Sequence, residues 1–145
     1  MGVRFSLLLS TCFYIGRIKY APGTLASLFT FVIWAFFVPH DFMLRLAIIL
    51  ILTFIGYIST TQSLPVFKEK DPQAIVIDEV VGMSISLLFI TEIALMLVAF
   101  ILFRILDILK PSIIYYSQKF KGAHGIMLDD IIAGSCVLII LIMYT

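Results

Sequence analysis

Phe103-Arg-Ile-Leu-Asp-Ile-Leu-Lys-Pro111 is followed by a short polar passage and then by Lys121-Gly-Ala-His-Gly-Ile-Met-Leu-Asp-Asp-Ile-Ile-Ala-Gly134. This stretch separates two apolar blocks and holds three carboxylates among four bases: Arg104, Asp107, Lys110, Lys119, Lys121, Asp129 and Asp130. Charged loops alone can set the topology of a membrane protein, but topology requires neither these acids nor the Pro and Gly residues between them. The mixture is typical of a site that holds a hard cation together with a phosphate group.

The composition predicts an integral membrane protein with a single domain over residues 1–145. Of its 145 residues, 62% are hydrophobic and 13% are charged, and the mean hydropathy is +1.16. Soluble domains are roughly half apolar and a quarter charged. The net charge of +1 gives no sign of nucleic acid as a partner. Cys12 and Cys136 form no Cys-x-x-Cys pair, which argues against a zinc or redox site.

The apolar runs predict an all-α, polytopic helical bundle with some short or re-entrant helices. Residues 5–16 resemble a signal peptide but lack a small-x-small cleavage site, so we expect a retained, membrane-associated helix. The further apolar runs are residues 24–39, 42–61, 80–103 and 131–145. A spanning helix needs about 20 apolar residues, so 24–39 is marginal and 131–145 is too short without its flanks. Thr24 is a candidate helix cap.

The bases predict how these runs cross the membrane. Nine of them lie in three polar zones: Arg4, Arg17, Lys19, Lys68, Lys70, Arg104, Lys110, Lys119 and Lys121. Only Arg45 lies in the opposite turn, so the positive-inside rule places all three zones on the cytoplasmic side. Residues 80–103 must then form a hairpin that turns near Glu92, which would be costly in mid-membrane. As a single span, the same run would instead place residues 104–130 outside.

Five acidic residues lie near the ends of apolar runs, and they allow a structural interpretation. Asp78 and Asp129 would cap the helices that follow them. Asp107 would pair with Arg104 or Lys110, because residues three apart share one ridge of a helix. Capping needs only one acid at each helix start, however, and both acidic pairs carry a second.

The functional interpretation of the same acids is a Mg²⁺ site. Mg²⁺ takes oxygen ligands in an octahedron, keeps several waters, and binds a few carboxylates together with substrate phosphate. Adjacent acids on a helix diverge by about 100°, so one member of each pair would hold the metal while the other orients water or takes a proton. Bases would neutralise phosphate oxygens. The candidate metal ligands are Asp78, Glu79, Asp107, Asp129 and Asp130, and the candidate phosphate-binding bases are Arg104, Lys110 and Lys121.

Other phosphatase chemistries lack their signatures in this sequence. Cys12 and Arg17 are one residue too close for Cys-x5-Arg, and Asp-x-Asp-x-Thr is absent. A phosphohistidine mechanism calls for histidines among Arg-rich motifs, whereas this chain has only His40 and His124. These absences favour hydrolysis that depends on a metal ion.

Four blocks of the sequence resemble the phosphatidylglycerophosphatase A family, in that family's order and over nearly the whole chain. The blocks are Ala21-Pro-Gly-Thr24, Ile75-Val-Ile-Asp-Glu-Val-Val-Gly-Met83, Phe103-Arg-Ile-Leu-Asp-Ile-Leu-Lys-Pro111 and Gly125-Ile-Met-Leu-Asp-Asp-Ile-Ile-Ala-Gly134. The departures from the family pattern are at Ala26, Ser84, residues 112–114 and Ala123. None of them changes a charged position, so they bear on loop shape and headgroup fit.

The resemblance implies an all-helical bacterial inner-membrane phosphatase that depends on Mg²⁺ and has its active site at the cytoplasmic face. Such an enzyme removes the terminal phosphate of phosphatidylglycerophosphate to give phosphatidylglycerol. The carboxylates that match its acidic motifs are Asp78, Glu79, Asp107, Asp129 and Asp130. Thr24 and Ser27 match a polar wall of the site. We expect the catalytic group to be among Asp130, Glu79 and Asp129, acting either as a base on water or as a nucleophile that forms an aspartyl-phosphate.

Two other classes of function remain open from the residues alone. A small cation-handling membrane protein would place its carboxylates deep in the bundle, accessible from both sides. A scaffold subunit would change only its assembly when Asp129 or Asp130 is neutralised. A lipid phosphotransferase would need a nucleotide-binding or donor motif, and the sequence shows none.

Overall fold

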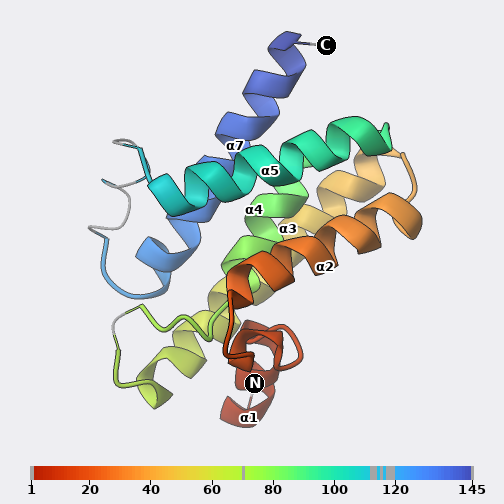
Figure 1. Cartoon of the computed structure of the whole chain (residues 1–145). Coiled ribbons are helices and arrows are strands. Elements are labelled where there is room, and N and C mark those ends of the chain that lie inside the picture. Colours follow the sequence, from red (N-terminus) through yellow and green to blue (C-terminus); the bar gives the residue numbers. More distant parts are fainter. Residues whose placement is uncertain (1, 70, 112–113, 115, 117–119, 145) are drawn as a thin grey trace.

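The chain folds into a bundle of helices, seen in a computed structural model that describes residues 2–69, 71–111, 114, 116 and 120–144 (Figure 1). Within these ranges there are six α-helices and no strand, which confirms the all-α prediction. The helices are α1 Val3–Ser10, α2 Pro22–Phe36, α3 Phe42–Ser63, α4 Ile77–Ser86, α5 Ile93–Leu109 and α7 Ala123–Tyr144. Two short 3₁₀ turns, η1 Ile15–Arg17 and η2 Leu64–Val66, follow α1 and α3.

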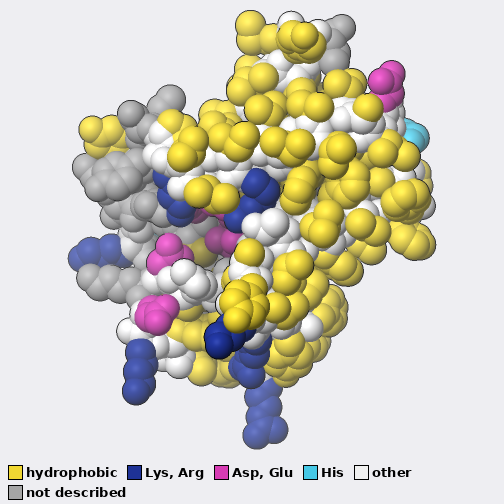
Figure 2. Space-filling view, viewed as in Figure 1, with side chains coloured by type: hydrophobic (Ala, Val, Ile, Leu, Met, Phe, Trp, Pro, Cys, Tyr) yellow, Lys and Arg dark blue, Asp and Glu magenta, His cyan; other side chains and the backbone are white. Residues whose placement is uncertain are grey.

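Two segments are long and apolar enough to cross a membrane, namely Phe42–Val66 and Ala123–Tyr144. Apolar side chains cover much of the face of the bundle shown in Figure 2, while several Lys and Arg side chains gather at its lower end. Outward-facing apolar residues of α3 include Leu50, Ile51 and Phe54, each more than half exposed at 61%, 58% and 67%. These features suggest that the protein associates with a membrane.

The last helix is longer than the apolar run that predicted it. α7 begins at Ala123 and therefore includes Asp129 and Asp130, which the sequence placed before the helix. Capping of this helix by Asp129 is therefore wrong, because the residue lies more than a turn inside it. At the start of α3, by contrast, Asp41 does act as a cap, since its Oδ1 accepts a hydrogen bond of 2.8 Å from the Leu44 N–H.

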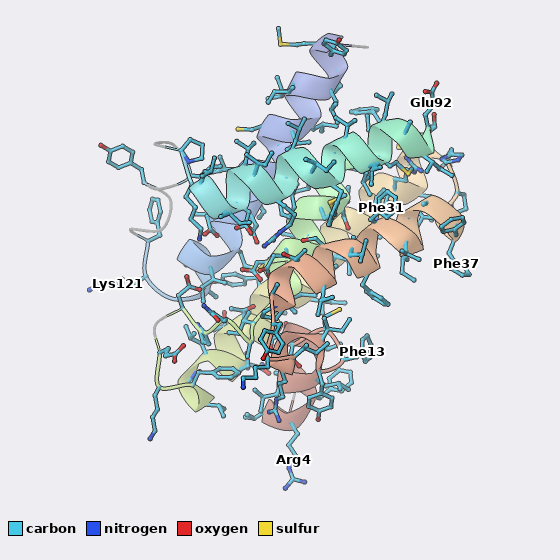
Figure 3. All side chains as sticks on the ribbon, in the orientation of Figure 1. Arg4, Phe13, Phe31, Phe37, Glu92 and Lys121 are labelled. Carbon is cyan, nitrogen blue, oxygen red and sulfur yellow. The ribbon has the colours of Figure 1, made fainter. Side chains whose placement is uncertain are left out.

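The run 80–103 is broken into α4 and α5, as the hairpin prediction required. Arg45 of α3 is almost fully buried and donates hydrogen bonds to the carbonyl oxygens of Leu87 at 3.1 Å and Ile90 at 2.7 Å. These carbonyls lie just beyond α4, where the helix no longer satisfies them and only the Leu87 oxygen has a backbone donor, the Ile90 N–H at 3.2 Å. Glu92 precedes α5 and is exposed at the end of the bundle remote from Arg4 (Figure 3).

The N-terminal helix is shorter than predicted. α1 ends at Ser10, because Cys12, Phe13 and Tyr14 have φ angles of 47°, 54° and 70°. Such left-handed conformations cannot continue a right-handed helix. The predicted helix over 5–16 is therefore wrong in its second half.

The predicted cap at Thr24 is also wrong. α2 already begins at Pro22, whose fixed φ angle suits the first helical position, so Thr24 lies within the first turn. The residue before it, Ala21, has a φ of 45° and provides no side-chain cap.

α4 lies at the centre of the bundle and packs against α2, α3, α5 and α7. Its closest approach is to α7, where a β-carbon on Gly82 would lie only 2.6 Å from the Asp130 carbonyl oxygen. Ser86 also donates a hydrogen bond to the Gly134 carbonyl oxygen of α7 at 3.5 Å. The small-xxx-small spacing of Gly82 and Ser86 thus marks a close helix contact.

Candidate active site

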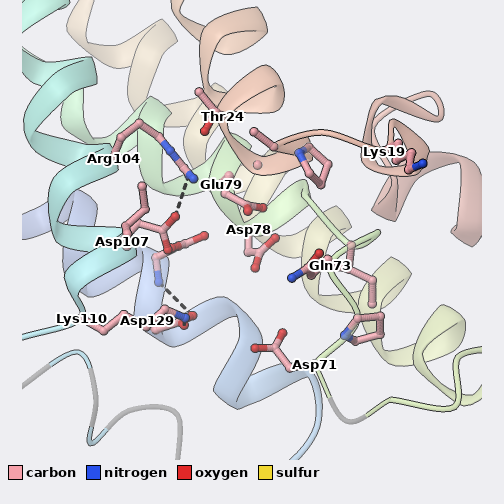
Figure 4. Close-up of a pocket in the computed structure, with 17 residues that line it drawn as sticks. Lys19, Thr24, Asp71, Gln73, Asp78, Glu79, Arg104, Asp107, Lys110 and Asp129 are labelled. Carbon is pink, nitrogen blue, oxygen red and sulfur yellow. Dashed lines mark hydrogen bonds and ion pairs between the residues drawn. The ribbon is translucent and has the colours of Figure 1, made fainter.

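A cavity of about 500 Å³ lies where four helices meet, and charged residues of three of them and of two loops line it. It is bounded by the start of α2, the first turn of α4, the C-terminal part of α5 and the acidic pair of α7 (Figure 4). Arg104 and Lys110 lie on one side of it, and Lys19 and Gln73 lie across from them. Its charged lining residues are Lys19, Asp71, Asp78, Glu79, Arg104, Asp107, Lys110, Asp129 and Asp130.

Three carboxylates form the centre of this site. One ligand oxygen from each of Asp78, Glu79 and Asp130 lies within 4.8 Å of the other two. Asp78 Oδ1, Glu79 Oε2 and Asp130 Oδ1 are buried, and none has a hydrogen-bond partner among the residues that the structure describes. Buried carboxylate oxygens are normally satisfied by donors or by a metal ion. The residues present therefore fit a bound cation.

The charge balance of the cavity points to the same conclusion. Six carboxylates and three bases line it, which leaves an excess of negative charge. Burial raises the pKa of Glu79 to about 7. Burial, together with the neighbouring charge of Glu79, raises the pKa of Asp78 well above its usual range. A divalent cation would stabilise the ionised carboxylates, and its oxygen-only ligands suit a hard ion such as Mg²⁺.

The other two predicted metal ligands are engaged by bases at the edge of this cluster. Arg104 Nη1 lies 2.6 Å from Asp107 Oδ2, and Lys110 Nζ lies 2.9 Å from Asp129 Oδ2. The predicted pairing of Asp107 with Arg104 is therefore present. Both ion pairs line the cavity, so the structure brings together all five predicted carboxylates but places three of them as a compact group.

Some of the predicted phosphate-binding and wall residues lie at the cavity, and others lie away from it. Thr24 lines the cavity, and Ser27 lies behind it, with its hydroxyl 3.5 Å from Arg104 Nη1. Lys121 is exposed, does not line the cavity, and points away from the helices in Figure 3. Lys119 lies outside the described residues.

Three lining residues were missed by the sequence analysis. Asp71 was not among the candidate residues, and Lys19 served only to predict topology, yet both line the cavity. Gln73 follows Asp71 in the same loop. The Pro residues near these positions were the available signal, because they fix the loops that carry the side chains.

The start of α2 adds hydrogen-bond donors to the cavity. Gly23 and Thr24 line it, and no side chain caps the first turn of the helix. A β-carbon on Gly23 would overlap Glu79 Oε1, so a larger residue here would displace the Glu79 carboxylate. Free N–H groups at a helix N-terminus bind phosphate oxygens well.

The cysteine chemistry excluded by the sequence is also absent from this site. Cys12 is buried outside the cavity, and burial raises the pKa of its thiol to about 11. A thiol with such a pKa is almost fully protonated at neutral pH and is a poor nucleophile.

The fold and the site together define an all-α protein with two helices of membrane-spanning length and a buried acidic cluster able to hold a metal ion. A profile of the family described as "Phosphatidylglycerophosphatase A" matches residues 8–145. The chain belongs to this family and is a phosphatase of the phosphatidylglycerophosphatase A type.

Three curated relatives are similar to the chain over most of its length. The chain is 33% identical to phosphatidylglycerophosphatase A of Escherichia coli K12 over 130 residues, covering 88% of this chain and 76% of the relative. It is 35% identical to the Haemophilus influenzae protein of the same name over 143 residues, covering 92% and 84%. It is 36% identical over 137 residues, covering 88% and 86%, to a protein of Bacteroides thetaiotaomicron named "Putative phosphatidylinositol-3-phosphatase". No solved structure matches the chain significantly.

Proposed function

We propose that this protein is a Mg²⁺-dependent phosphatase that hydrolyses phosphatidylglycerophosphate to phosphatidylglycerol and inorganic phosphate. The observation that carries the proposal is the compact group of Asp78, Glu79 and Asp130, whose unpartnered oxygens share one cavity with Arg104 and Lys110. Carboxylates alone would repel a phosphate, whereas carboxylates that hold a cation beside two bases would bind it.

In this proposal the metal ion would be held by members of the group Asp78, Glu79 and Asp130, with Asp107 and Asp129 beside it. When bound, Mg²⁺ supplies positive charge that polarises the phosphate and offsets charge developing in the transition state. Arg104 and Lys110 would exchange part of their present ion pairs for phosphate oxygens. The free amides at the start of α2 would bind a further oxygen.

One carboxylate of the cluster acts as the general base. Either Asp130 or Glu79 takes a proton from water as the water oxygen attacks phosphorus in line with the ester oxygen. The bond between phosphorus and the ester oxygen breaks, and that oxygen leaves as the hydroxyl of phosphatidylglycerol after gaining a proton. The alternative is direct attack by a carboxylate such as Asp129, which would leave a phosphorylated enzyme that can be trapped.

The substrate's acyl chains call for an active site at a membrane surface. We place α3 and α7 across the cytoplasmic membrane, with α4 and α5 as a hairpin and the cavity facing the cytoplasm. The exposed apolar side chains of α3 support this placement, as do the bases around the cavity. These bases also favour a phosphatase over a cation-handling protein, since a cation pathway gains nothing from Arg104 and Lys110.

A second candidate substrate is an inositol phospholipid, which the name of the Bacteroides thetaiotaomicron relative favours. Phosphatidylinositol 3-phosphate carries a terminal phosphate monoester and a phosphodiester, as phosphatidylglycerophosphate does. The same cluster would serve either lipid, so a direct comparison of the two substrates is needed.

Phosphate release from purified protein in neutral detergent tests the proposal. We expect phosphatidylglycerophosphate to be hydrolysed with Mg²⁺, no release in EDTA, and a loss of more than about 100-fold in Asp130→Asn, provided that the variant folds. Faster release from phosphatidylinositol 3-phosphate would transfer the assignment to that lipid. Release that survives both EDTA and Asp130→Asn would refute the metal mechanism.

A further inference from the structure

A second cavity of about 430 Å³ adjoins the candidate active site, and nothing in the proposed chemistry uses it. The two cavities share Lys19, Pro22, Pro72 and Gln73 in their walls. The second cavity differs in charge, because Arg17, Lys19 and Lys68 line it against a single acid, Glu69. We call this second cavity, defined by Arg17, Lys19, Lys68 and Glu69, the basic annex.

The bases of the annex are available for a ligand. Arg17, Lys19 and Lys68 are all exposed, and the ion pairs found among the described residues involve none of them. Arg17 lies 5.0 Å from the centre of the Tyr14 ring, and Lys19 lies 5.8 Å from that of Tyr20. Contacts with aromatic faces orient a cation without neutralising it.

The walls of the annex are held in place by close packing. A β-carbon on Gly16 would overlap the carbonyl oxygen of Ala74, so the turn after α1 lies directly against the loop before α4. The Val76 N–H donates a hydrogen bond of 2.9 Å to the Ser10 carbonyl oxygen, which joins the same two segments. The annex is therefore a fixed feature between two loops rather than a chance gathering of lysines.

An apolar border lies beside the annex. Ile18 lines it and is 47% exposed, and the neighbouring Phe13 and Tyr14 are 64% and 50% exposed. Phe13 lies at the outer side of the turn after α1, below α2 in the view of Figure 3. Exposed aromatic residues beside bases are typical of positions at the level of lipid headgroups.

The order of these features matches the order of groups in the proposed substrate. Phosphatidylglycerophosphate carries a terminal phosphate monoester, a glycerol bridge, a phosphodiester and then the acyl chains. The active-site cavity holds the carboxylate cluster and shares a wall at Lys19 with the annex, and the apolar Ile18 lines the annex. We infer that the annex binds the phosphodiester of the lipid substrate while the terminal phosphate lies at Asp78, Glu79 and Asp130. This inference rests on the proposed function and adds the part of the substrate that sets specificity.

The experiment uses dihexanoyl phosphatidylglycerophosphate in neutral detergent, where no other anionic lipid is present. In Arg17→Gln/Lys68→Gln we expect KM to rise about tenfold with kcat unchanged, since two exposed contacts of modest strength are lost. The inhibition constant of inorganic phosphate, which needs only the active-site cavity, stays as in the wild type. Glu69→Gln removes the one opposing acid and lowers KM, which tests the inference in the opposite direction.

The control is Arg4→Gln, which removes an exposed base outside both cavities and leaves KM unchanged. Unchanged KM values in both annex variants would overturn the inference. The inference would also be overturned if the variants bound inorganic phosphate more weakly by the same factor as the lipid substrate. An effect on KM seen only with anionic vesicles would overturn it as well. Either result would indicate a general electrostatic field around the protein. Failure of the proposed function is distinct, because the wild-type protein would then release no phosphate from this lipid.

Discussion

Gly82 on α4 and Gly134 on α7 lie so close together that a β-carbon on Gly134 would overlap the carbonyl oxygen of Gly82. Each glycine is four residues beyond a carboxylate of the cluster, Asp78 on α4 and Asp130 on α7. Residues four apart lie on the same face of a helix. The glycine contact thus brings the two carboxylates to one side of the crossing and fixes their separation.

We therefore expect Gly134→Ala to damage both stability and activity. The added methyl group must push α7 away from α4, which costs about 1–3 kcal/mol of unfolding free energy and outweighs the better helix propensity of alanine. Because Asp130 moves with α7, kcat/KM should fall about 100-fold. Thermal unfolding in detergent and phosphate release measure the two effects.

Gly2→Ala is the matched control for this substitution, since a β-carbon there meets nothing within 4 Å. Gly2→Ala should change neither the melting temperature nor the rate of phosphate release. A Gly134→Ala protein as stable and as active as wild type would show that the close crossing does not position Asp130.

Lys110 and Lys121 should differ sharply, although both were expected to bind phosphate from the sequence. Lys110 lines the cavity and pairs with Asp129 at 2.9 Å, whereas Lys121 is exposed outside it. We expect Lys110→Gln to lower kcat/KM by about 10- to 100-fold, the value of one or two charge-assisted hydrogen bonds. Lys121→Gln should stay within about twofold of wild type in the same assay. Equal losses in the two variants would contradict this assignment of the cavity.

The stabilisation given by Mg²⁺ should depend on pH. Burial raises the pKa of Glu79 to about 7, so the metal-free folded state binds more protons than the unfolded chain between the ordinary glutamate pKa and about pH 7. The free energy of unfolding of the metal-free protein therefore falls as pH rises through that window, because Glu79 loses its proton in the folded state. Mg²⁺ competes with these protons, so it should raise the melting temperature more at about pH 8 than at about pH 5.5.

Differential scanning fluorimetry with Mg²⁺ or EDTA at the two pH values measures this effect. Glu79→Gln provides the control, because it cannot titrate and should make the Mg²⁺ response small at both pH values. A wild-type response of equal size at both pH values would contradict the proposed role of Glu79 as a metal ligand.

Arg45 should contribute to stability and not to chemistry. It donates hydrogen bonds to the carbonyl oxygens of Leu87 and Ile90, and its guanidinium lies 5.3 Å from the centre of the Trp34 ring. Arg45→Met leaves the Ile90 carbonyl oxygen without its donor and removes one of the two donors to the Leu87 carbonyl oxygen, at a cost of about 2 kcal/mol in unfolding free energy. The Arg45→Met protein that remains folded should release phosphate with the wild-type KM. The control is Arg4→Met at an exposed site, which should alter neither the unfolding free energy nor the KM. A Met variant as stable as wild type would show that the turn does not depend on Arg45.

The sequence by itself determined the class of the protein and singled out the carboxylates that meet in one cavity. Hydrophobic runs of helical length predicted an all-α bundle, and the motif spacing predicted that Asp78, Glu79, Asp107, Asp129 and Asp130 would act together. The all-α prediction is confirmed, and all five carboxylates line one cavity, because apolar runs and local charge patterns depend on neighbours along the chain. The break between α4 and α5 was also predictable, since an acid in mid-membrane is costly.

Only the tertiary structure decided which carboxylates form the compact group and which pair with bases. That division depends on how α4 and α7 cross at Gly82 and Gly134, a contact between residues far apart in the sequence. The left-handed turn after α1 and the annex beside Lys19 likewise depend on packing against the loop before α4. Local patterns specify helices and candidate groups, but the distances between those groups are set by contacts that no local pattern contains.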